Sequence, residues 1–222
     1  MIILSIDTSG VDCSACVYDS ENDTVLGEVT ENIGKGHAEL LMGIIDDALS
    51  KAGLTLNAVE RLAVTIGPGS FTGIRVGVAA ARGFALSLDV EAVGITTLET
   101  LAAYHQRQQP GQPVAVGLDA KRGECYLQIF AADGVPLTEA ALVSLDDARQ
   151  SLVGFDGAII GSAAPLFAGA ETGSGPDHFP IATVARVAAT KPAHQPKPAP
   201  LYLRGPDARP QSGFALERLS PA

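Results

Sequence analysis

The sequence contains few of the residues that build disulfide frameworks or histidine-based active sites. Among 222 residues there are three cysteines and four histidines. So low a cysteine count argues against a disulfide framework, and the histidines are too scattered to suggest a catalytic triad. No apolar run reaches the roughly 18 residues that a membrane span needs, and the amino terminus lacks the basic region of a signal peptide. We therefore expect a cytoplasmic protein with no membrane attachment.

Basic residues are also scarce. Lysine and arginine together number 15 against 25 acidic residues, which gives a net charge of −10. The acidic excess lies in residues 1–110, whereas bases outnumber acids in residues 186–222. An acidic body is a poor electrostatic match for a nucleic-acid backbone. If the protein acts in an RNA pathway, we expect its contact with the RNA to be indirect.

Two of the cysteines, Cys13 and Cys16, have the C-x-x-C spacing of some metal sites. No second pair or nearby histidine accompanies them. They also fall in a segment that alternates like a strand, where residues three apart face opposite sides of the sheet. The pattern favours small core residues and predicts no metal site.

Periodicity predicts an alternation of strands and helices in the first half of the chain. Three strands that follow one another closely should form an antiparallel meander, and a helix–strand–helix–strand–helix series should follow. The predicted strands are 2–7, 13–19, 25–31, 61–66 and 90–94, and the predicted helices are 37–52, 72–88 and one that begins at Thr96 or Thr97 with Glu99 in its first turn.

The chain then repeats itself. "LSIDTSGVDCSACVY" (4–18) aligns without a gap on "VGLDAKRGECYLQIF" (116–130), which places Asp7 on Asp119 and Cys13 on Cys125. "LAVTIGPGS" (62–70) resembles "GAIIGSAAP" (157–165) at a smaller offset, so the second copy has lost about one helix. We predict two tandem ββ-β-α-β-α units, the second truncated, with domains at 1–110 and 111–222.

The segment "TIGPGSFTGIRVG" (65–77) looks like a phosphate-binding loop but matches neither the Walker pattern nor the dinucleotide fingerprint. Two interpretations stay open. Ser70 or Thr72 caps the helix that follows, or the free N–H groups at the helix start bind an anion with help from Arg75. The capping interpretation is favoured. The glycines would then allow another backbone segment to pack closely against the loop.

The helix 72–88 is apolar on almost every side, and a helix of this kind is buried on every side. One side can pack on its own sheet, and the other needs a second surface. Helix 37–52 also has a broad apolar stripe. We predict that the two helices bind a partner protein, although they could instead cover each other. The predicted partner interface comprises His37, Leu41, Ile44, Ile45, Ala48, Gly73, Arg75, Val76, Gly77, Ala80 and Ala81.

A tandem pair of units with an Asp at each first hairpin turn resembles the actin–Hsp70–sugar kinase (ASKHA) superfamily, whose members usually bind ATP between the two halves. Here the resemblance implies a degraded cleft. Asp7, Thr8, Ser9 and Asp119 form a possible vestigial phosphate loop. The later glycine-rich adenosine segment is missing, and "GSGP" (173–176) is too short to replace it.

Four motifs together resemble the bacterial TsaB (YeaZ) family: "IDTS", "GPGSFTGIRVG", "LDAKRGECY" and "YLR.PDA". The resemblance implies a non-catalytic subunit that helps to place a threonylcarbamoyl group on N6 of adenosine 37 in tRNA. It also implies a transferase paralogue, TsaD, as partner, an ATPase, TsaE, in the assembled complex, and a homodimer through the same helices. ATP, ADP and Mg²⁺ would be expected only in that complex. The metal-binding H-x-x-x-H pair of the transferase is incomplete, because Leu41 stands four residues after His37.

The alternative is a small ATP-dependent kinase or ATPase that uses Asp7 and Asp119. A peptidase has no nucleophile–base pair to support it. From Lys191 onward prolines are frequent, and we predict that "PLYLRGPDARP" (200–210) packs across the body in extended form, with a disordered tail as the alternative.

Overall fold

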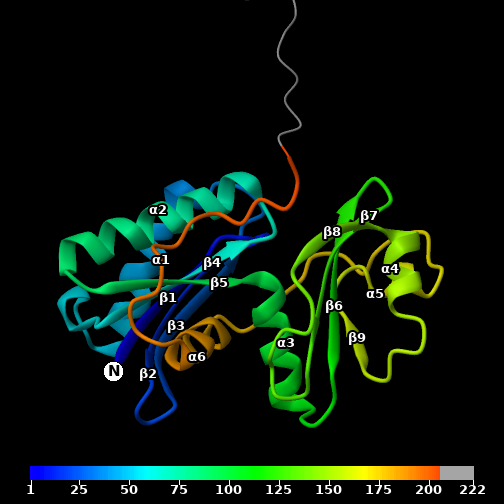
Figure 1. The fold of residues 1–222 in the computed structure, drawn as a ribbon. Coiled ribbons are helices and arrows are strands. Elements are labelled where there is room, and N and C mark those ends of the chain that lie inside the picture. The colour runs from blue at the N-terminus through cyan, green and yellow to red at the C-terminus, as the bar shows by residue number, and fades with distance from the viewer. Residues whose placement is uncertain (206–222) are drawn as a thin grey trace, which may run out of the picture.

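A five-stranded mixed sheet is built by the first half of the chain (Figure 1). The computed structural model describes residues 1–205. Strands β1, β2 and β3 form the predicted antiparallel meander, and β4 and β5 add to β1 in parallel, in the order β3-β2-β1-β4-β5. The strands are β1 (Ile2–Asp7), β2 (Asp12–Asp19), β3 (Thr24–Asn32), β4 (Arg61–Gly67) and β5 (Glu91–Thr96). The central strands β1 and β4 are almost wholly buried, as expected for strands covered on both faces.

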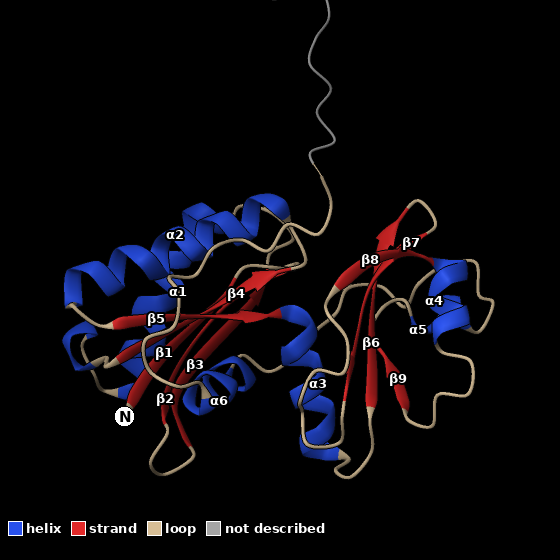
Figure 2. Ribbon diagram, in the orientation of Figure 1, coloured by secondary structure: helices blue, strands red, loops and turns tan. Residues whose placement is uncertain are grey.

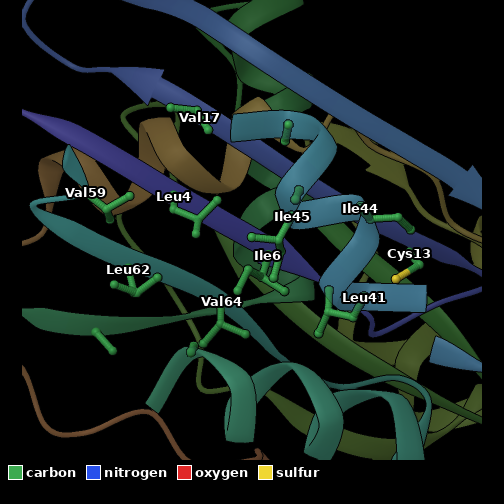
Figure 3. Packing of buried hydrophobic residues seen from close by; sticks show 14 of the residues in the cluster. Leu4, Ile6, Cys13, Val17, Leu41, Ile44, Ile45, Val59, Leu62 and Val64 are labelled. Atoms are coloured by element: carbon green, nitrogen blue, oxygen red, sulfur yellow. The ribbon is translucent and has the colours of Figure 1, made fainter. Parts of the chain in front are cut away.

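Two helices, α1 (His37–Ala52) and α2 (Phe71–Leu88), cover one face of this sheet. Figure 3 shows Leu41, Ile44 and Ile45 of α1 packed among apolar side chains of β1 and β4. Gly53 ends α1 in the left-handed conformation that glycine adopts readily at a helix end. A short 3₁₀ helix, Leu56–Ala58, leads from α1 into β4.

By length and composition, α2 could cross a membrane: its 18 residues have a mean hydropathy of 1.2. The core helix of a soluble protein can pass the same test. Ile74 and Val78 of α2 lie in the core of the first sheet, and Arg75 and Arg82 are exposed on the same helix. Among the described helices, α2 alone meets the criterion.

The second half of the chain builds a four-stranded sheet in the order β8-β7-β6-β9, which matches the order β3-β2-β1-β4 of the first (Figure 2). A helix of 7 residues, α4, stands where the first half has the 16-residue α1. The mixed α/β fold with two sheets is confirmed, and the duplication stays a prediction that this match supports. The elements are β6 (Val114–Lys121), β7 (Glu124–Phe130), β8 (Ala141–Ser144), α4 (Leu145–Ser151), β9 (Ala158–Ile160) and α5 (Ala164–Phe167).

The gapless alignment of the two hairpins is wrong by one residue. Asp7 pairs with Ser14 in the first hairpin, whereas Asp119 pairs with Cys125 in the second. The paired residues are therefore one position closer along the chain in the second copy. Its turn is tighter, because β6 continues to Lys121 and β7 begins at Glu124.

Two helices cross between the halves of the chain. Helix α3 (Thr97–Gln108) follows β5 but packs in the core of the second sheet, where Leu98 and Leu101 are buried. Thr96 caps α3 by accepting a hydrogen bond from the Glu99 N–H, as the sequence predicted. Helix α6 (Ala182–Thr190) returns to cover the other face of the first sheet. Each sheet thus has one face covered by a helix from the other half.

After α6, residues 191–205 form an extended segment, called here the C-terminal strap, which runs back along the first sheet (orange in Figure 1). The Gln195 N–H donates to the Glu91 carboxylate at 2.6 Å, and the Leu201 N–H donates to the Ile66 carbonyl at 2.8 Å. The predicted extended packing of 200–210 is confirmed as far as Gly205. The rest of that segment, with the end of the "YLR.PDA" motif, lies outside the described residues.

Arg61 links helix α6 and the C-terminal strap to the first sheet. Its guanidinium is buried and donates to the carbonyls of Ala188 and Lys191 and to the Glu91 carboxylate, at 2.9, 3.1 and 2.9 Å. We expect Arg61→Met to cost about 3 kcal/mol of unfolding free energy, because the partly buried Glu91 carboxylate loses its counter-ion and two backbone carbonyls lose a donor.

Urea unfolding followed by circular dichroism measures this effect. Arg107→Gln is the matched control, since it breaks the exposed ion pair with Asp23 and should leave the midpoint close to that of the wild type. Equal midpoints for the two variants would contradict the role assigned to Arg61.

Candidate functional site

The turn after β1 is built around the buried carboxylate of Asp7. One of its oxygens accepts hydrogen bonds from the Thr65 hydroxyl at 2.5 Å, the Ser9 hydroxyl at 2.7 Å and the Ser9 N–H at 2.9 Å. Burial raises the pKa of Asp7, and the three donors act in the opposite direction. The carboxylate thus fixes the turn that leads into the cleft between the two halves.

The glycines of the loop 65–77 make room for this turn. The Ser70 N–H donates to the Ser9 carbonyl at 2.6 Å, and the Thr8 hydroxyl donates to the Gly73 carbonyl at 2.7 Å. A Cβ atom added at Gly73 would stand 2.0 Å from the Thr8 carbonyl oxygen, and one added at Gly69 would stand 2.2 Å from that of Ser9. The predicted close backbone approach is confirmed, and the neighbour is the chain's own turn.

The start of α2 is therefore occupied by protein groups. Ser70 caps the helix by accepting a hydrogen bond from the Gly73 N–H at 3.2 Å, which confirms the favoured interpretation of the loop. The Ser9 carbonyl takes the N–H of Ser70. The N–H groups of Ser70 and Gly73, which could otherwise contribute to an anion site at the helix start, are thus bound by protein oxygens.

A cleft of about 490 Å³ lies between the two halves. Both predicted aspartates line it: Asp7 from the end of β1 and Asp119 from the end of β6. Asp119 accepts hydrogen bonds from the N–H and the ammonium group of Lys121, at 2.8 and 2.5 Å. Ser9 lines the cleft as well, whereas Thr8 is buried beneath α2.

The sequence analysis missed Ser162 and Asp177, which also line the cleft. Ser162 accepts a hydrogen bond from the Asp119 N–H at 2.9 Å, and its own N–H donates to Asp177 at 2.7 Å. Burial raises the pKa of Asp177. Gly175, from the discounted "GSGP" segment, lies in the same wall. Four carboxylates line this cleft, those of Asp7, Asp12, Asp119 and Asp177.

The cysteines lie in the cores of the sheets. Cys13 packs on the α1 side of the first sheet and Cys16 on the α6 side, so they face opposite ways as predicted. Burial raises the pKa of the Cys13 thiol to about 11 and that of Cys16 to about 12. In residues 1–205 no group of three histidine, cysteine, aspartate or glutamate side chains could hold a metal ion.

Most residues of the predicted partner interface are buried inside this chain. On α1, His37 is buried, and its ring nitrogen lies 3.1 Å from the Asp12 carbonyl. On α2, Arg75 is exposed and Val76 and Ala80 are partly exposed. The buried members are His37, Leu41, Ile44, Ile45, Ala48, Gly73, Gly77 and Ala81.

Other apolar residues of the same helices lie at the surface. Leu86 of α2 is 84% exposed, and Leu40 and Met42 of α1 are 42% and 49% exposed. We call these residues, together with small residues of α2 that are exposed or partly exposed, the outer helix surface. It consists of Leu40, Met42, Val76, Ala79, Ala80, Gly83 and Leu86.

Two mixed sheets meet at a cleft, and each places an aspartate at or near the end of its first strand, so the chain has a two-sheet α/β fold with a cleft between its halves. Comparison with known proteins adds a family. The family model described as "TsaD: tRNA N6-adenosine threonylcarbamoyltransferase" matches residues 20–167. The chain belongs to the family that this model describes, and its named relatives there are TsaB (YeaZ) proteins.

The relatives match to different extents. The tRNA threonylcarbamoyladenosine biosynthesis protein TsaB of Escherichia coli is 33% identical over 133 residues, or 60% of this chain, and the match spans little more than half of that protein, 56%. An uncharacterized protein of Mycobacterium tuberculosis is 31% identical over 94% of both chains. The solved structure of YeaZ from Pseudomonas aeruginosa has a TM-score of 0.58 at 29% identity, over 64% of this chain and 67% of its own.

A substitution pair in α2 tests the role of the glycines. We expect Gly73→Ala to cost about 1–3 kcal/mol of unfolding free energy, because its methyl group would displace the Thr8 backbone. Gly83→Ala in the same helix has no atom within 4 Å of the new Cβ and should gain up to about 1 kcal/mol. Urea unfolding compares the two, and similar effects of the same sign would contradict the packing role.

The raised pKa of Asp7 predicts a pH dependence. The folded protein releases this proton at higher pH than the unfolded chain, so the contribution of Asp7 to stability falls as pH rises from about 4. Asp7→Asn keeps an accepting oxygen without the charge. Relative to the wild type, it should gain stability between pH 4 and pH 7 in urea unfolding, and a relative loss over that range would contradict the burial effect.

Proposed function

We propose that this protein is a non-catalytic subunit in the formation of N6-threonylcarbamoyladenosine on tRNA, and that it binds a TsaD-like transferase through α1 and α2. Membership of the family supports the pathway. The observation that carries the binding role is the outer helix surface, with Leu86 84% exposed. An apolar surface of this kind on a helix pair is typical of a protein interface.

Three features favour a subunit without its own catalysis. The Asp7 carboxylate is engaged by Ser9 and Thr65. The start of α2 is occupied by the Ser9 carbonyl. The transferase's pair of metal-binding histidines is reduced to His37, which contacts a backbone carbonyl, and a single imidazole cannot hold a metal ion without further ligands.

The same surface would allow a homodimer when the transferase is absent, and the two assemblies would then compete. The net charge of −10 favours indirect contact with the tRNA, through the partner subunits. We further propose that a TsaE-like ATPase joins the complex and that ATP, ADP and Mg²⁺ bind only there. The proposed location is the cytoplasm.

Binding of the transferase can be tested with a matched pair of surface variants. Leu86 and Val153 are 84% and 82% exposed, on α2 and in the second half respectively. We expect Leu86→Asp to weaken binding by about tenfold or more, as for a buried interface anchor. Val153→Asp should bind like the wild type.

Size-exclusion chromatography and calorimetry with the purified transferase give the measurement, after circular dichroism has established that both variants fold. Ile45 and Gly77 are unsuitable test positions, because both are buried in this chain. Undiminished binding by folded Leu86→Asp would overturn the proposed interface.

The alternative, an ATP-dependent kinase or ATPase, makes a different prediction. It requires ATP and Mg²⁺ to bind in the cleft of the isolated chain with Asp7 involved. On our proposal, calorimetry with ATP and Mg²⁺ should give the same heat for the wild type and for Asp7→Asn. Micromolar binding that disappears in Asp7→Asn would favour the enzyme.

A further inference from the structure

A second cavity, of about 700 Å³, lies beside the cleft. The two share Pro68, Gly69 and Tyr126 in their walls. The first turns of α2 form one side of the second cavity, and the end of the C-terminal strap forms another. Two hydrogen bonds fix the strap at this point: Leu201 N–H to Ile66 in the first half, and Arg204 to Glu124 in the second, at 2.8 and 2.6 Å. We call it the strap cavity.

The strap cavity and the cleft carry opposite charge. Four aspartates and one lysine, Lys121, line the cleft. Among residues 1–205, no aspartate or glutamate lines the strap cavity, and the charged lining residues are Arg75 and Arg204. Arg204 is neutralised by Glu124, whereas Arg75 makes no ion pair within residues 1–205. In a chain with 25 acidic residues against 15 basic ones, this cavity is where an anion would be attracted.

Arg75 is held in place from two sides. Its guanidinium carbon lies 3.7 Å from the centre of the Phe71 ring, and its Nε donates to the Tyr202 hydroxyl at 2.7 Å. The Phe71 and Tyr202 rings lie 5.3 Å apart. The bond to Tyr202 is the only hydrogen bond of the Arg75 side chain within the described residues. Both terminal nitrogens of the guanidinium group therefore remain available to a ligand. A guanidinium fixed in this way is prepared to bind a phosphate with two parallel hydrogen bonds.

The remaining lining suits a planar ring. Phe71 and Tyr202 are 54% and 48% exposed although both are large, and Leu201 and Leu203 add apolar surface. Exposed aromatic rings next to an arginine are the groups on which nucleobases stack. The volume lies in the range of small-molecule sites, roughly 300–1,000 Å³, and it exceeds what a single carboxylate side chain of a partner would fill.

We propose that the strap cavity binds a mononucleotide, with its phosphate on Arg75 and its base on the exposed rings of Phe71 and Tyr202. This gives Arg75 a role in ligand binding that differs from the partner contact predicted from the sequence. It places a nucleotide site outside the acidic cleft. The inference goes beyond the proposed function and departs from one part of it, because it lets the isolated chain bind a nucleotide outside the assembled complex.

Calorimetric titration of the full chain with AMP at low ionic strength tests the proposal. The tyrosine fluorescence of the protein, which contains four tyrosines and no tryptophan, gives a second signal. We expect AMP to bind, and adenosine and ribose 5-phosphate, which each supply one half of the ligand, to bind more weakly. Arg75→Gln should weaken AMP binding by about tenfold or more. Tyr202→Phe, which keeps the ring but removes the hydroxyl that holds Arg75, should weaken it less.

Arg82→Gln is the matched control: it removes the same charge from an exposed position of the same helix, outside the cavity. It should bind AMP like the wild type, and so should Asp7→Asn in the cleft. Absence of AMP binding at millimolar concentration would overturn the proposal, as would equal weakening by Arg75→Gln and Arg82→Gln. A short oligonucleotide should bind no better than AMP, and binding of the oligonucleotide alone would also overturn it.

Discussion

The close contact between the Thr8–Ser9 turn and α2 is the constraint on which the rest of this structure depends. Two carbonyl oxygens of the turn lie where Gly69 and Gly73 have no side chain. The contact orients Asp7, caps the loop before α2, and fixes the angle at which the helix leaves it. The loop 65–77, whose glycines look like those of a phosphate-binding loop, therefore acts as a joint between a strand and a helix. The inner side of α2 packs closely on the Thr8–Ser9 turn, which leaves the apolar outer side of the helix facing away from the sheet.

The two cavities on either side of Pro68 and Gly69 show how one loop can separate opposite electrostatic environments. On one side, carboxylates from both halves share a cleft, and burial raises the pKa of two of them, Asp7 and Asp177. On the other side, a stacked arginine and two exposed rings form a wall to which the described residues add no carboxylate. A phosphate without a bound metal ion would be repelled from the acidic cleft and attracted to the strap cavity. The charge distribution, more than the fold, decides where an anion can bind.

Much of this arrangement followed from local patterns in the sequence. The strands and helices of the first half were predicted to within a residue or two, because apolar periodicity, Gly53 and Thr96 mark them clearly. Helices α4 and α6 were missed, since seven and nine residues give little periodicity. Helices α3 and α6 each pack on the sheet of the other half of the chain. This arrangement depends on contacts between segments far apart in the sequence, which local patterns do not predict. Most of the predicted interface lies buried inside the chain for a related reason. In a helix that is apolar all round, composition does not tell which side faces the sheet, and so Leu86, Ala79 and Gly83 were overlooked.

The position of α6 and the strap has a consequence for biosynthesis. Ile3, Ala63 and Val93 belong to the first sheet, yet the helix that covers them, α6, follows the whole second sheet in the chain. Until α6 has been made, the first sheet has an uncovered apolar face and an unprotected edge at β5, a combination that favours aggregation. We therefore expect the first half of the chain to complete its fold only after α6 has left the ribosome.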